Sequence, residues 1–162
     1  MNQAPSARHL FDQFVAAASA ARTNDTDAVE VNKALVHRYF EMWNTGDGSN
    51  ADTILGGTYL DHAHPEVIGP AAMRSLVPRF HAANPDATMR ITVAAADAEF
   101  VAVNNTITRT VHGRQVASTG IALFRVEGKR LVEQWSSYPD AETPPSPLAP
   151  RAALEQWLTF RA

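Results

Sequence analysis

The spacing of apolar residues changes once along this chain, near residue 88, and this change limits the possible folds more than any other feature. Upstream, apolar side chains recur every three or four residues, as on one face of a helix: Val31, Leu35, Tyr39 and Met42. Downstream, apolar and polar residues alternate, as in a half-buried strand: Met89, Ile91 and Val93. Turn sequences at 112–114 and 127–129 divide this half into antiparallel strands joined by hairpins. Helices grouped ahead of an antiparallel sheet predict an α+β fold with the helices on one face of the sheet.

The upstream half is expected to hold two helices before the first strand. One begins at Ser6, and a longer one follows the capping sequence 24–27 and ends at the turn residues 44–48. A short helical turn at 51–55 then leads to an extended segment at 58–62.

A further helix is expected over 71–83, where Pro78 predicts a kink or an early break. After the strands, the Pro-rich segment 143–147 is a stiff connector to a last helix at 151–160. That helix is apolar on one side and therefore needs a surface to cover.

At 162 residues, with 45% hydrophobic and 19% charged residues, the chain has the length and composition of one globular domain. Its net charge of -3 and the lack of any Lys or Arg run argue against a nucleic-acid partner. There are no cysteines, so disulfides and thiolate chemistry are excluded. No stretch approaches the ~20 apolar residues of a membrane span, and the first six residues lack the pattern of a secretory signal. We therefore expect a cytoplasmic protein with no membrane partner.

Three separated motifs resemble the NTF2-like superfamily, in particular its SnoaL-like, polyketide cyclase-like branch. Residues 36–47 are similar to its opening helix, residues 59–62 to its Tyr-x-Asp-His element, and residues 124–135 to its last hairpin. The resemblance implies an NTF2-like cone, in which N-terminal helices pack on a curved antiparallel sheet around a pocket for a small hydrophobic molecule. It covers about residues 29–140, which leaves an N-terminal helical extension at 1–28 and a Pro-rich connector with a C-terminal helix at 141–162.

The resemblance gives roles to Tyr39 and His62. Tyr39 matches the tyrosine with which ketosteroid isomerases stabilise an oxyanion, and a phenol in a dry pocket can hydrogen-bond a developing enolate. His62 falls where those enzymes keep the aspartate that shuttles the proton, and a histidine, whose ordinary pKa is about 6.5, also suits proton abstraction. The competing interpretations are a core tyrosine whose hydroxyl bonds to a neighbour and an Asp–His pair that only fixes the strand.

A metal site at Asp61, His62 and His64 is the less favoured alternative. If the segment is extended, adjacent side chains alternate between faces, so Asp61 points away from His62. The two histidines then share one face without a third ligand. We expect no metal and no cofactor.

The chain departs from the known enzymes of the superfamily at their remaining acids. Gly120 stands near the place of the second acid of the isomerases, and the Arg-x-Asp element of the epoxide hydrolases is missing. Where SnoaL-type cyclases carry an aspartate, Trp135 is followed by Ser136 and Ser137. The cyclase acid is therefore absent or displaced to Asp140.

The remaining candidates are substrate-binding residues. Arg109 shares a strand face with Asn105 and could place a cation in the cone to hold a carboxylate or phenolate; the favoured alternative is an arginine that reaches out to water. Gln134 and Ser136 share a face of the last strand and could hydrogen-bond a carbonyl. Two tryptophans are expected in the pocket wall: Trp43 and Trp135.

The leading hypothesis is a cyclase- or isomerase-type enzyme that acts by general acid/base chemistry on a hydrophobic carbonyl compound. His62 is the base, Tyr39 the hydrogen-bond donor, and Asp140 or Gln134 assists. The alternatives are a non-catalytic binding or dimerisation protein, and an epoxide hydrolase or dehydratase with the unusual acid pair Asp61 and Asp140. A homodimer is also predicted, because apolar residues are expected on the open face of the sheet: Ile121 and Leu123.

Overall fold

The computed structural model describes residues 26–138, so the helices expected at the two ends and the Pro-rich connector lie outside the described residues. In chain order the elements are α2 (Thr26–Thr45), the 3-10 helix η1 (Gly48–Asn50), α3 (Ala51–Ile54), β1 (Leu55–Asp61), α4 (Gly69–Ala83), β2 (Thr88–Ala96), β3 (Phe100–Val111), β4 (Arg114–Glu127) and β5 (Arg130–Ser137). The predicted α+β order, with the change at residue 88, is confirmed.

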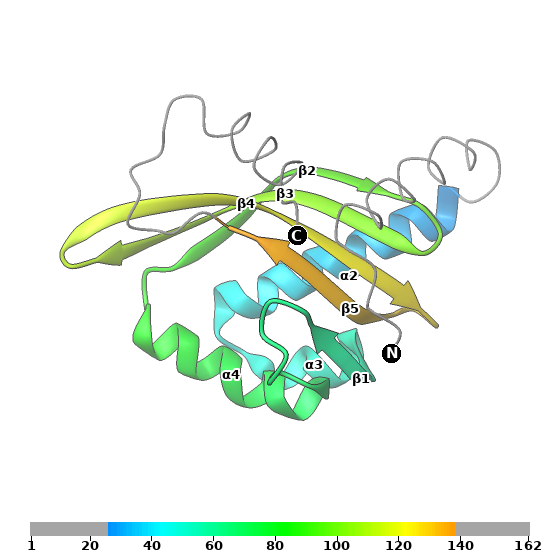
Figure 1. Cartoon of the computed structure of the whole chain (residues 1–162), viewed down its shortest axis with the longest axis horizontal. Helices are drawn as coiled ribbons and strands as arrows, with labels where there is room; N and C mark the ends of the chain where they lie inside the picture. Colours follow the sequence, from blue (N-terminus) through cyan, green and yellow to red (C-terminus); the bar gives the residue numbers. More distant parts are fainter. Residues whose placement is uncertain (1–25, 139–162) are drawn as a thin grey trace, which may run out of the picture.

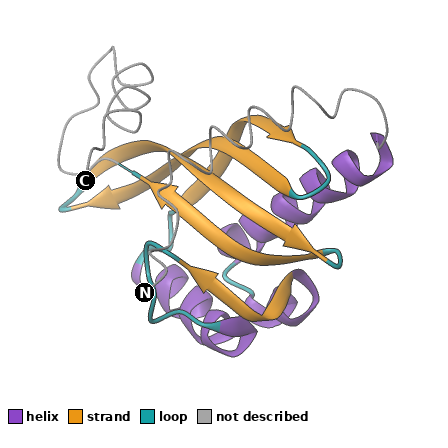
Figure 2. Ribbon diagram, turned by 45° about the vertical axis from the view of Figure 1, so that its right-hand side comes forward, coloured by secondary structure: helices purple, strands orange, loops and turns teal. Residues whose placement is uncertain are grey.

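The strands form one five-stranded sheet in the order β1-β5-β4-β3-β2. Neighbouring strands are antiparallel except that β1 pairs with β5 in parallel. The sheet is strongly curved, and α2, α3 and α4 lie on one of its faces (Figures 1 and 2). This is the cone expected from the resemblance.

Both predicted hairpins have two-residue loops with left-handed backbone. His112 and Gly113 have φ of 49° and 75°, and Gly128 and Lys129 have φ of 58° and 60°. Two successive positive φ values define the turn whose twist matches that of the flanking strands. The local sequence therefore sets the register of β3 on β4.

Two elements differ from their expected bounds. The strand expected at 58–62 already begins at Leu55, and the pairing of β1 with β5 is irregular between Leu55 and Leu60. Gly56 lies in this irregular stretch, where a Cβ would come within 2.9 Å of the Val132 side chain, so glycine permits the strands to approach. Helix α4 does not end early at Pro78, which is exposed.

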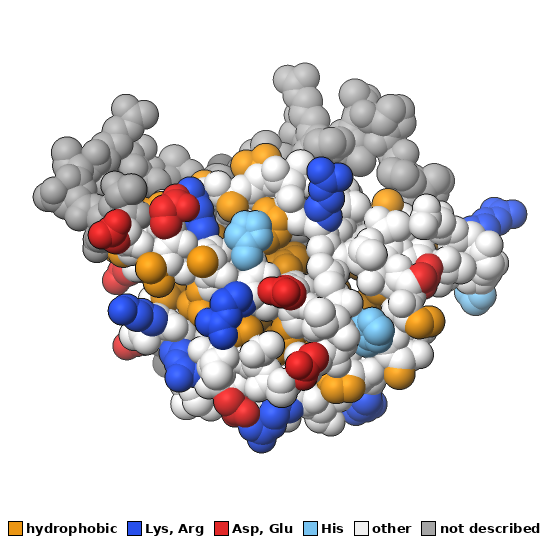
Figure 3. Space-filling model, turned by 180° about the vertical axis from the view of Figure 1, so that it is seen from behind, with side chains coloured by type: hydrophobic (Ala, Val, Ile, Leu, Met, Phe, Trp, Pro, Cys, Tyr) orange, Lys and Arg blue, Asp and Glu red, His pale blue; other side chains and the backbone are white. Residues whose placement is uncertain are grey.

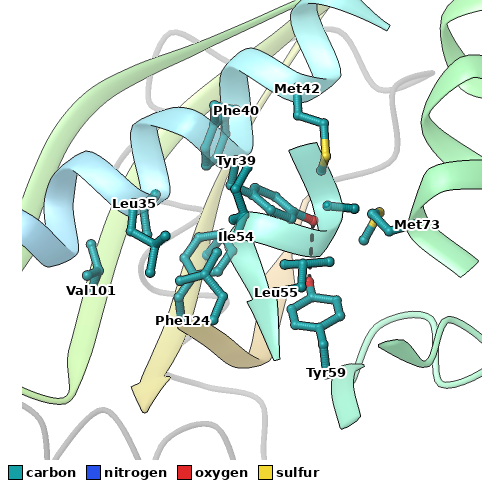
Figure 4. Packing of buried hydrophobic residues seen from close by; sticks show 14 of the residues in the cluster. Leu35, Tyr39, Phe40, Met42, Ile54, Leu55, Tyr59, Met73, Val101 and Phe124 are labelled. Carbon is teal, nitrogen blue, oxygen red and sulfur yellow. Dashed lines mark hydrogen bonds between the residues drawn. The ribbon is translucent and has the colours of Figure 1, made fainter. Parts of the chain in front are cut away.

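The core lies between the helices and the inner face of the sheet. Phe124 of β4 is fully buried, and its ring contacts those of Tyr39 and Phe40 on α2 edge-on, at centroid distances of 5.1 and 6.2 Å. Figure 4 shows how side chains from α2, α3, β1 and α4 close around this contact. The core therefore fixes α2 against β4, and with it the position of Tyr39.

The outer face of the sheet departs from expectation at Leu123. This residue is only 2% exposed and packs with Phe100, Ala102 and Trp135, whereas Ile121 is half-buried. An exposed Leu123 was therefore a wrong expectation. The homodimer stays a prediction: light scattering that finds only a 17.6 kDa species would contradict it.

The surface carries mixed charge. On the face shown in Figure 3, basic and acidic side chains are interspersed and neither sign forms a patch. Among residues 26–138, no helix is both long enough and apolar enough to cross a membrane.

Candidate functional site

A cavity of about 1030 Å³ lies between α2, α4 and the inner face of the sheet. Its wall is largely aromatic and aliphatic, and the rings of Trp43 and Phe80 meet edge-on there at 5.3 Å. Polar side chains line the rest of it: Asp61, His64, Glu66, Ser75, Arg79, Gln134, Ser136, Ser137 and Tyr138. A large apolar cavity with a few convergent polar groups is typical of small-molecule sites.

Asp61 and Gln134 are brought together by strand pairing. They are register partners on β1 and β5, and the His62 N–H donates to the Gln134 carbonyl oxygen at 2.8 Å. Both side chains line the cavity although each residue is only 6% exposed. The sheet therefore places a carboxyl and a carboxamide side by side at one end of an apolar space.

Two tyrosines fix the orientation of the Gln134 side chain. The hydroxyls of Tyr39 and Tyr59 both donate to Gln134 Oε1, at 2.7 and 2.5 Å, and lie 3.4 Å from each other. Figure 4 shows these two hydroxyls pointing toward one another from α2 and β1. Because each phenol has one proton and needs an acceptor, the amide oxygen faces the tyrosines. The amide NH₂ is thereby the group left to donate to a ligand.

Burial sets the protonation of this end of the cavity. It raises the pKa of both Tyr39 and Tyr59 well above the usual range, and the nearby Asp61 charge raises them further, so both phenols stay neutral. Burial also raises the pKa of Asp61, opposed by the Ala63 N–H that donates to its carboxylate at 2.9 Å and by the neighbouring His64. A carboxylate with a raised pKa is a stronger base than an exposed one.

A third tyrosine, Tyr138, follows β5 and lines the same cavity. Its hydroxyl donates to Asn105 Oδ1 at 2.8 Å, and burial raises its pKa to about 12. A Cβ at Gly120 would overlap the Tyr138 ring, so only glycine on β4 leaves it room. Sequence reasoning missed Tyr138. The one available signal was Gly120, because a glycine inside a strand often marks a close approach.

Asn105, the partner of Tyr138, is fully buried, and its Nδ2 has no hydrogen-bond partner in the described part of the chain. We predict that Tyr138→Phe lowers the free energy of unfolding by about 1–3 kcal/mol, because the buried Asn105 then loses its remaining partner. Chemical denaturation measures the loss. The double variant Tyr138→Phe/Asn105→Leu should recover much of it, since replacing both partners by apolar groups is far less costly. A double variant less stable than the single one would contradict this account.

His62 lies on the other face of the sheet. Its ring stacks on Trp135 at a centroid distance of 4.5 Å and an angle of 9°, and its Nε2 is 3.4 Å from Glu133 Oε2. Neither His62 nor Trp135 lines the cavity, so both were wrongly placed in the pocket by sequence reasoning. The reason is strand alternation: of two adjacent residues, only Asp61 faces inward.

The histidines do not form a metal site with Asp61. His64 lies beyond the end of β1 and is exposed, so it does not continue the alternation expected for an extended segment. In the range 26–138 no three His, Cys, Asp or Glu side chains are grouped as a metal site requires.

The other predicted residues divide between the cavity and its surroundings. Trp43 and Ser136 line the cavity, as expected. Arg109 instead donates to Asn84 Oδ1 at 3.0 Å and does not line it; the arginine that does is Arg79 of α4. Asp140 lies outside the described residues.

Comparison with known families and structures agrees with this architecture. The model of the SnoaL-like domain family matches residues 36–134, and the chain belongs to that family. Comparison with curated protein sequences finds no match.

Solved structures similar to the chain include a SnoaL-like polyketide cyclase from Agrobacterium tumefaciens, at 15% identity over 78% of this chain and 97% of that one, with a TM-score of 0.59. TsrD from Streptomyces laurentii matches at 16% identity over 86% and 100%, with a TM-score of 0.61. A Catenulispora acidiphila protein with a ketosteroid isomerase-like fold, in complex with trimethylamine, matches at 18% identity over 65% and 85%, with a TM-score of 0.58. At these identities the likeness establishes the NTF2-like fold.

Proposed function

We propose that the cavity is the active site of a cofactor-independent cyclase- or isomerase-type enzyme that acts on a hydrophobic carbonyl compound. The observation that carries the proposal is the pairing of Asp61 with Gln134 at the polar end of an apolar cavity. Asp61 takes the role that the sequence analysis gave to His62. Of these two adjacent titratable residues, only Asp61 lines the cavity.

In the proposed reaction the Asp61 carboxylate removes a proton from the carbon next to the substrate carbonyl. The electron pair of the broken C–H bond moves into the carbonyl group, whose oxygen becomes an enolate stabilised by the Gln134 NH₂. In an isomerisation, the Asp61 carboxyl returns the proton to another carbon of the enolate. In a cyclisation, the enolate carbon attacks a second carbonyl of the same molecule, and the carboxyl protonates the new alkoxide. Both routes restore the Asp61 carboxylate.

Tyr39 acts in this scheme as a positioning residue. Its proton is donated to Gln134 Oε1, as is that of Tyr59, so the two phenols hold the amide with its NH₂ toward the ligand. The aromatic wall around Trp43 and Phe80 excludes water, which strengthens the hydrogen bond to the enolate.

The test uses 2-tetralone, a bicyclic ketone with acidic C–H bonds, in D₂O. Proton NMR follows the exchange of its α protons for deuterium in wild type and in Ser75→Trp, which places an indole into the cavity. Ala71→Trp is the control, because Ala71 is exposed on the same helix but does not line the cavity. We expect exchange above the uncatalysed rate in wild type and Ala71→Trp, and its loss in Ser75→Trp.

Exchange at the uncatalysed rate in wild type, or exchange unaffected by Ser75→Trp, would contradict the proposal. Quenching of tryptophan fluorescence by 2-tetralone without any exchange would instead support the alternative of a non-catalytic binding protein.

A further inference from the structure

The cavity contains a cation that the proposed reaction does not use, Arg79 on α4. Arg79 lines the cavity and is exposed, and no ion pair or hydrogen bond joins it to another residue in the range 26–138. Two other arginines nearby are engaged: Arg74 pairs with Asp52, and Arg109 donates to Asn84. The guanidinium of Arg79 is thus available to a ligand in the cavity.

Arg79 lies far along α4 from the acidic end of the cavity. Helix α4 begins at Gly69, directly after the bridge that joins Ile68 to Leu60 of β1. Arg79 is ten residues further on, which at 1.5 Å per residue is ~15 Å along the helix axis.

The two acids that line the cavity, Asp61 and Glu66, both precede the start of α4. The histidine at this end of the cavity, His64, already has an acidic neighbour: its Nδ1 lies 3.7 Å from Glu66 Oε1. The charge of the cavity is therefore polarised: the acids lie toward the β1 end, and the free arginine lies toward the C-terminal half of α4. A ligand anion is repelled from the first end and attracted to the second.

We propose that Arg79 is a specificity residue for a carboxylate, so that the substrate is an aromatic or polycyclic keto acid. Its carboxylate binds the guanidinium, whose donors suit the two oxygens of a carboxylate. Its ring system lies against Trp43 and Phe80, and its ketone reaches Asp61. The presence of a ketone in the substrate rests on the proposed function. The preference for a carboxylate rests only on the position of Arg79 and the charges that line the cavity.

The test compares two probes of one shape, 2-naphthoate and its neutral amide 2-naphthamide, by isothermal titration calorimetry at pH 7. In wild type the acid should bind roughly three- to tenfold more tightly than the amide, as expected for a partly exposed ion pair. Arg79→Gln should abolish this preference, and Arg79→Lys should keep part of it. Arg114→Gln is the matched control, since Arg114 is exposed at the distant β3–β4 hairpin, and it should keep the full preference. Added salt should weaken the preference in wild type.

Equal affinity for the two probes, a preference that survives Arg79→Gln, or no binding of either probe at millimolar concentration would each overturn the inference. Neither probe is a ketone, so the result does not depend on turnover. A wild type that prefers naphthoate but exchanges no protons of 2-tetralone would therefore contradict the proposed reaction and leave the role of Arg79 standing.

Discussion

Asp61→Asn is expected to reduce the exchange of 2-tetralone α protons by about 10²- to 10⁴-fold, the range contributed by a positioned general base. Asparagine keeps the size of the side chain and its amide oxygen can still accept from the Ala63 N–H, so the fold is preserved while the base is removed. Proton NMR in D₂O measures the rate.

Glu66→Gln is the control for Asp61→Asn. Glu66 also lines the cavity, but it is exposed and lies next to His64 on the segment between β1 and α4. Its loss removes a similar charge without removing the base and should change the rate little. Equal losses in both variants would mean that cavity charge, rather than Asp61 itself, drives the exchange.

Asp61→Asn should also stabilise the protein at neutral pH. Burial raises the pKa of Asp61 in the folded state, so the folded chain holds this proton more tightly than the unfolded chain. The stability linked to this group is fully present below its ordinary pKa of 3.8 and is lost as the pH rises through the raised folded value. Asp61→Asn should therefore be more stable than wild type at pH 7, and the difference should shrink as the pH falls toward 3.8. Thermal melts across this pH range measure it, and a variant less stable than wild type at pH 7 would contradict the account.

Phe124→Ala is expected to lower the free energy of unfolding by about 3–5 kcal/mol, the usual cost of removing a buried aromatic ring. Phe124 is fully buried and contacts both Tyr39 and Phe40, so its loss opens a cavity between β4 and α2. Urea denaturation measures the change. Because Tyr39 also holds Gln134, the variant should lose exchange activity even at temperatures where it stays folded.

Two further variants bracket the effect of Phe124→Ala. Phe124→Leu fills part of the space and should cost less than the alanine variant. Val93→Ala changes a residue that is 62% exposed and should alter the free energy of unfolding by no more than about 0.5 kcal/mol. A loss below about 1 kcal/mol in Phe124→Ala would show that the α2–β4 contact is not central to the core.

The fold was predictable because its signals are local. The change of apolar spacing near residue 88 marks the boundary between helices and sheet, and the turn residues at 112–113 and 128–129 specify two-residue hairpins. The strand start at Leu55 was not predictable, because β1 forms by pairing with β5, which lies about 75 residues further along the chain.

The site was predictable only in part, because its chemistry depends on which face each side chain takes. The sequence points to the Asp61–His62 pair but not to the member that enters the cavity, which the end of β1 and its pairing with Gln134 decide. Arg109 was a candidate for the cavity cation, with an arginine that reaches out to water as the favoured interpretation. It donates to Asn84, and Arg79 lines the cavity instead. These outcomes depend on contacts between distant segments, which apolar spacing does not encode.

The pH–rate profile of His62→Phe tests the central claim, that Asp61 is the base, most directly. Phenylalanine can keep the stack on Trp135 while it removes the imidazole that the sequence proposed as the base. The account predicts that the variant exchanges 2-tetralone protons nearly as fast as wild type, with a rate that rises with pH through the raised pKa of Asp61. Loss of exchange in His62→Phe would show that His62 is the base and that the assignment to Asp61 is wrong.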